Sequence, residues 1–145
     1  MDTKVALAVG ELLFQQFSSL QEIAGKTLQS VWEIERLGCV EQVILDFGPV
    51  SFVVLAISED DSVAFWCMKT TDLDTNGRVD ASQGEFWSKF IGEPFGWGWL
   101  TVNQQGYCDG MLLSFGGIVP QVVMNIKASS IAWGRISMVA KPQAG

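Results

Sequence analysis

The sequence predicts an α+β domain with a mainly antiparallel, meander-like sheet of seven or eight strands, an N-terminal helix and one inserted short helix. Three observations favour this fold class. Apolar residues recur at helical spacing near the amino terminus, alternate with period two from about Leu28 onward, and form one further helical stripe midway along the chain. No internal repeat or linker divides the 145 residues, so we expect a single domain over residues 1–145.

Both helices are predicted from an apolar stripe that is followed by a stop signal. The N-terminal helix is expected to end near Gly25, and five apolar residues share one of its faces: Val9, Leu12, Leu13, Phe17 and Leu20. The inserted helix is expected to begin at Ser82 and to end at Gly92. Ser82 and Glu85 form an S-x-x-E capping box, in which each side chain satisfies an unpaired backbone N–H at a helix start.

The strands are predicted from alternation and from the turns that separate them. Alternating apolar residues over 32–35 and 42–47 indicate two half-buried strands. The unbroken apolar run Phe52 to Ile57 is typical of a central strand covered on both faces, and Val63 to Met68 is expected to return as its hairpin partner. Four more strands are expected in the last third: Trp97 to Val102, Tyr107 to Phe115, Val122 to Ile126 and Ile131 to Val139.

Composition and charge exclude several classes of function. The chain has 9 basic and 16 acidic residues, a formal net charge of -7 and no basic patch, so we expect no nucleic acid as a partner. It contains no histidine, which removes Ser-His-Asp and Cys-His catalysis and His-ligated zinc. Three widely spaced cysteines without a C-x-x-C favour free thiols and a cytoplasmic location. No apolar run approaches the roughly 20 residues that cross a bilayer, so we expect no membrane partner.

Residues 72–80 match most of an EF-hand-type calcium loop. Side-chain oxygens stand at its positions one, three, five and nine: Asp72, Asp74, Asn76 and Asp80. Gly77 occupies position six, but Gln83 replaces the bidentate carboxylate at position twelve, so any calcium would bind weakly. The alternative is that Asp, Asn and Gly gather here because they tolerate tight turns. Apart from calcium we expect no cofactor.

An aromatic hairpin is the second candidate site. Trp97 and Trp99 share one face of their strand, because strand side chains alternate with period two. They could form a platform for a ligand or a partner protein, or they could fill the space between sheet and helices. Asn103, Tyr107 and Asp109 would add a polar cluster near the turn. A catalytic role for Asp109 would need a second carboxylate beside it.

The segment from Trp97 to Gly110, with the pattern W-G-W…N-Q-Q-G-Y-x-D, resembles a family of small bacterial proteins of unknown function, and the likeness extends from about Leu28 to Met138. The resemblance implies a compact α+β domain of the bacterial cytoplasm without an assigned activity. The leading hypothesis is a noncatalytic protein-interaction module, of regulatory or immunity type, that uses an acidic face and the aromatic hairpin and that could also form a homodimer. The alternatives are a weak calcium-binding protein and a carboxylate-based enzyme.

Overall fold

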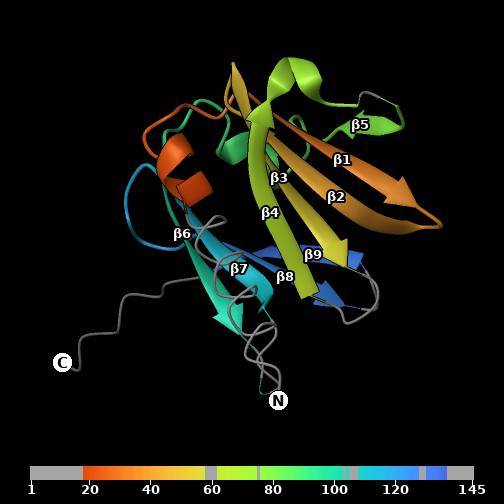
Figure 1. Cartoon of the computed structure of the whole chain (residues 1–145). Coiled ribbons are helices and arrows are strands. Elements are labelled where there is room, and N and C mark those ends of the chain that lie inside the picture. The colour runs from red at the N-terminus through yellow and green to blue at the C-terminus, as the bar shows by residue number, and fades with distance from the viewer. Residues whose placement is uncertain are drawn as a thin grey trace, which may run out of the picture.

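The computed structural model describes residues 18–57, 62–74, 76–102, 104, 108–127 and 130–136. In this part of the chain nine strands form two antiparallel sheets (Figure 1). The first sheet has the order β4-β3-β2-β1-β5, with β1 (Ser30–Arg36), β2 (Cys39–Asp46), β3 (Val50–Ile57), β4 (Ser62–Lys69) and β5 (Arg78–Asp80). The second has the order β6-β7-β8-β9, with β6 (Phe95–Val102), β7 (Cys108–Phe115), β8 (Val122–Lys127) and β9 (Ser130–Arg135).

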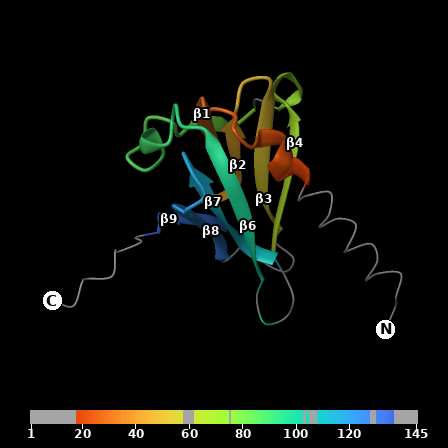
Figure 2. The same ribbon diagram turned by 90° about the vertical axis from the view of Figure 1, so that its left-hand side faces the viewer.

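The predicted α+β class is therefore wrong, and the fold is nearly all antiparallel sheet. Each sheet has one strongly apolar face, which must be buried against another layer. We expected helices to supply that layer, but the second sheet supplies it instead: β9 packs across β2, and β4 packs across β7 (Figure 2). The two sheets are joined where Leu28 N–H donates to the Glu93 carbonyl at 3.0 Å and Phe95 N–H donates to the Lys26 carbonyl at 2.8 Å.

The inserted helix is also absent from the described residues. Only a short 3-10 helix, η2 (Trp87–Lys89), forms in this stretch, and another, η1 (Thr70–Asp72), precedes β5. Ser82 is recruited by β1 and caps no helix: its hydroxyl accepts from Val31 N–H at 2.7 Å and lies 3.2 Å from the Val31 carbonyl, to which it donates. A tertiary contact thus overrides the local capping signal and ties the end of β5 to β1.

A helix does precede the first sheet, over residues 18–23, and the remainder of the predicted N-terminal helix lies outside the described residues. Leu20 and Ile23 in this helix are fully buried. A Cβ atom at Gly98 of β6 would lie 2.8 Å from Leu20 Cδ2, so the absence of a side chain at position 98 lets the helix approach the second sheet.

The core lies between the two sheets and ends in an aromatic cluster. The Phe115 ring is tilted against Phe90 and meets Phe95 edge-to-face, with ring centroids 5.1 and 5.6 Å apart, and the ring centroids of Trp87 and Trp133 lie 5.9 Å apart. Trp87 is only 2% exposed, and its indole N–H has no hydrogen-bond partner among the described residues. The predicted central strand, β3, is an interior strand between β2 and β4.

Candidate functional site

The outer face of the first sheet carries an apolar row that does not belong to the core. Inward-facing neighbours such as Val43 and Val54 join the core cluster, whereas the outward-facing Ile44 and Val53 do not, although each is only 1% exposed. Cross-strand pairing places Trp32 beside Ile44, Ile44 beside Val53, and Val53 beside Trp66. We call these four residues the tryptophan row. The two indoles lie on either side of Ile44 and Val53. Side chains that pair across neighbouring strands contact one another, and this contact keeps Ile44 and Val53 from water.

Trp32 is held in one orientation by its neighbours. Its indole N–H donates to Ser30 Oγ at 2.9 Å, and Ser30 Oγ in turn donates to Asp46 Oδ2 at 3.0 Å. The other oxygen of Asp46 accepts from Gly48 N–H at 2.7 Å. The guanidinium carbon of Arg78 lies 4.3 Å from the Trp32 ring centroid, at cation–π distance. Trp32 is thus ordered in the free protein, so binding at this face would cost little further side-chain entropy.

Trp66 is the most accessible residue of the row, with 36% of its surface exposed. A second row beside it crosses all five strands and pairs Ala64, Leu55, Gln42, Ile34 and Arg78. Asp80 of β5 pairs with Trp32 at the end of the tryptophan row, so charge lies only on β5, where Arg78 and Asp80 nearly cancel. Hydrogen bonds from Ser82 hold the pKa of Asp80 below its usual range, so that carboxylate stays ionised. The centre of this face is therefore uncharged in a chain of net charge -7.

The structure places the predicted aromatic hairpin on β6 and β7. Trp97 is half-buried and packs against the core cluster, whereas Trp99 is half-buried outside that cluster and pairs with Leu112. A bulge between Phe95 and Gly98 interrupts the regular pairing here. The sequence placed both tryptophans on one face of the strand, as a platform or as filling for the interior, whereas the structure gives them different surroundings.

Of the three polar residues predicted at that hairpin, the structure describes only Asp109. Asp109 accepts a hydrogen bond from the Thr101 hydroxyl at 3.0 Å, which keeps its carboxylate engaged within the sheet. Asn103 and Tyr107 lie outside the described residues. The polar cluster predicted around the turn thus stays a prediction.

The calcium-like loop uses its oxygens for its own backbone. Asp74 Oδ1 accepts from Asn76 N–H at 3.0 Å, the Asx turn that favours such residues in loops. Asp80 lies in β5 and accepts from Ser82 N–H at 2.8 Å, while Asp72 closes η1. Among the described residues, no group of three or more His, Cys, Asp or Glu side chains could hold a metal ion.

Two surface hollows bear on the enzyme hypothesis. One, of about 410 Å³, is lined by polar residues and holds one carboxylate, Asp80. The other, of about 470 Å³, holds Glu22 and Cys67. Burial, with a further contribution from Glu22, raises the pKa of the Cys67 thiol to about 12, so this thiol is a poor nucleophile at neutral pH. Neither hollow pairs two carboxylates as acid–base catalysis by such groups requires.

Comparison with known proteins identifies a family without an activity. The sequence profile of DUF6334, a family of unknown function, matches residues 13–140. No curated protein and no solved structure matches the chain. None of the helices in the described part of the chain is long and apolar enough to cross a membrane.

Proposed function

This chain belongs to the DUF6334 family, whose function is unknown, and we propose that it is a noncatalytic protein-binding domain of the bacterial cytoplasm. The observation that supports the proposal is the tryptophan row on the outer face of the first sheet. The three cysteines of the chain are free, which fits a reducing compartment.

The energetics of Trp66 suit a binding hot spot. Tryptophan is enriched where protein interfaces concentrate their binding energy, next to well-packed apolar surface. Burying the exposed third of an indole would remove about 70 Å² from water, which at roughly 25 cal/mol per Å² gives about 2 kcal/mol. That corresponds to about thirtyfold in Kd. Ile44 and Val53 are almost fully buried, so they support the indoles without presenting much surface of their own.

Charge indicates that the partner at the tryptophan row is a different protein and not a second copy of this chain. The tryptophan row is uncharged, so its partner must present an apolar, uncharged surface, because an unpaired buried charge would be costly. Two copies of this chain would also bring together two bodies of net charge -7, whose repulsion opposes a homodimer at low salt. A partner of neutral or basic net charge meets both conditions.

The proposal is tested with the tagged full chain expressed in its source organism. We expect one protein to co-purify in stoichiometric amount with the wild type and to be lost with Trp66→Ser. Val102→Ser is the matched control, because Val102 is also apolar and is 63% exposed, but lies on β6. Melting curves must show that both variants fold, since Trp66 shelters Val53.

With the purified complex, Trp66→Ser should weaken binding about thirtyfold and Val102→Ser should change it less than threefold. Equal affinity in both variants would contradict the proposal. So would sedimentation data showing a homodimer that Trp66→Ser dissociates, because the row would then join two copies of the chain.

A further inference from the structure

Leu37 stands at the tip of the β1–β2 hairpin in a position that disfavours leucine. Its surface is 97% exposed, and its φ of 55° lies in the left-handed region. Among the described residues it is the only one other than glycine with a positive φ. Bulky residues rarely adopt this conformation, and such outliers concentrate at functional sites.

The turn itself shows which residue folding alone would select. Arg36 pairs with Cys39, so Leu37 and Gly38 form a two-residue loop, and both have positive φ (55° and 81°). Positive φ at both central residues is typical of a type I′ turn, where Asn-Gly is strongly preferred. Leucine here is unfavourable to the backbone and leaves an apolar side chain in water. Neither cost is compensated by a contact within the described chain.

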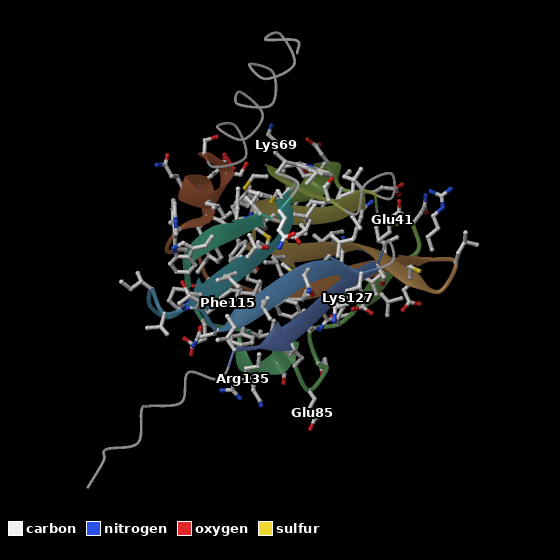
Figure 3. The ribbon with its side chains drawn as sticks, turned by 90° about the horizontal axis from the view of Figure 1, so that it is seen from below. Glu41, Lys69, Glu85, Phe115, Lys127 and Arg135 are labelled. Atoms are coloured by element: carbon white, nitrogen blue, oxygen red, sulfur yellow. The ribbon has the colours of Figure 1, made fainter. Side chains whose placement is uncertain are left out.

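Acidic side chains lie along the two strands that lead to this apolar tip. Glu33, Glu35 and Glu41 lie on the two strands of the hairpin, and we call them the acidic collar. Arg36 balances one of them, since its Nη1 lies 3.8 Å from Glu41 Oε1. Burial, and then the charge of Glu35, raise the pKa of Glu33. The β1–β2 hairpin projects beyond the neighbouring strands of the first sheet (Figure 1), and Glu41 of this hairpin is labelled in Figure 3.

We propose that Leu37 is an anchor residue, which inserts into an apolar pocket of the partner protein whose rim carries lysine or arginine. An exposed leucine suits an apolar pocket, and the acidic collar requires a basic rim. A second copy of this chain or an anionic membrane would meet the collar with like charge. The inference rests on the proposed function because it assumes a protein partner, but it concerns a different contact from the tryptophan row.

The experiment introduces a photoreactive phenylalanine analogue at position 37, at position 66 or, as a control, at position 102. The tagged full chain is irradiated in cells of its source organism, and cross-linked peptides are identified by mass spectrometry. We expect positions 37 and 66 to react with the same protein, and position 37 to mark an apolar site flanked by lysine or arginine. Position 102 should give background only.

Point variants then separate binding from folding. Leu37→Asn should raise the melting temperature, because Asn-Gly suits the turn, and should weaken binding of the identified partner about thirtyfold. A double variant, Glu35→Gln with Glu41→Gln, should weaken binding and reduce its dependence on salt.

The outcomes distinguish the two proposals. Cross-links from position 66 without cross-links from position 37 overturn the anchor alone, as does a Leu37→Asn variant of unchanged affinity. Cross-links from position 37 to another copy of this chain or to lipid also overturn it. Background from both positions overturns the protein-binding function as well.

Discussion

Replacing Gly96 of β6 by alanine should destabilise the protein severely, although the change adds one methyl group. A Cβ atom at position 96 would collide with the carbonyl oxygen of Gly117 and lie 2.5 Å from Ser114 Oγ. Ser114 is fully buried, and its hydroxyl accepts from Trp97 N–H at 2.8 Å and donates to the Gly117 carbonyl at 2.7 Å. The methyl group would therefore push the 116–119 loop away and break the bond that holds it.

The magnitude follows from two costs. Breaking the hydroxyl's bond to Gly117 costs about 0.5–1.5 kcal/mol, since the Trp97 carbonyl, 3.3 Å away, remains as a poorer acceptor, and overpacking a tight contact costs about 1–3 kcal/mol. We expect a loss of about 2–4 kcal/mol in the free energy of unfolding. For a chain of this size that loss lowers the melting temperature by about 10 °C.

Urea unfolding followed by tryptophan fluorescence measures the effect, and Gly117→Ala is the matched control. A Cβ atom at position 117 would meet nothing within 4 Å, so that variant should lie within about 1 kcal/mol of the wild type. In the double variant Gly96→Ala with Ser114→Ala, the cost should be smaller than the sum of the single costs, because the two changes break the same contact. If Gly96→Ala costs no more than Gly117→Ala, the described packing of the loop on β6 is incorrect.

Three further predictions concern the core, pH and calcium. Trp87→Phe should cost less than about 1.5 kcal/mol, against about 3–5 kcal/mol for Trp87→Ala, because phenylalanine keeps aromatic packing and removes an unpartnered indole N–H; similar unfolding midpoints for the two variants would contradict this. Since burial raises the pKa of Cys67 from 9.0 to about 12, its contribution to stability is complete below about pH 9 and is lost as the pH rises toward 12. Cys67→Ala should therefore show a smaller fall in melting temperature above pH 9 than the wild type; parallel curves would argue against the shift. Calcium at about 1 mM should leave the melting temperature unchanged, and a rise that Asp74→Asn abolishes would revive the calcium hypothesis.

Much of the strand content could be predicted because alternation is a local property. The segments over 32–35 and 63–68 fall within strands of the first sheet, 42–47 overruns the end of β2 by one residue, and the last third contains the strands expected there. The inserted helix could not be assigned correctly. Ser82 has the sequence signal of a helix cap, but its hydroxyl hydrogen-bonds instead to the backbone of Val31, 51 positions away.

The residues of the candidate site also depend on contacts between distant parts of the chain, which local sequence patterns do not show. Trp97 and Trp99 were selected because they are close in sequence, whereas Trp32 and Trp66 are 34 positions apart and meet one surface only through pairing across β1 to β4. Period-two spacing predicted the strands that carry them, but no sequence pattern shows that both tryptophans face the same way or that Ile44 and Val53 separate them. Leu37-Gly38 offered a weak signal, since a glycine beside an apolar residue between two strands does not by itself reveal a positive φ at the leucine.

By itself the sequence determined that the chain folds mainly into antiparallel strands and lacks histidine-based chemistry, because side-chain alternation and composition are properties of the chain. Only the tertiary structure decided that the strands divide into two packed sheets and that two distant tryptophans share one face. Those outcomes depend on strand register and on long-range hydrogen bonds, which arise from pairs of residues far apart along the chain.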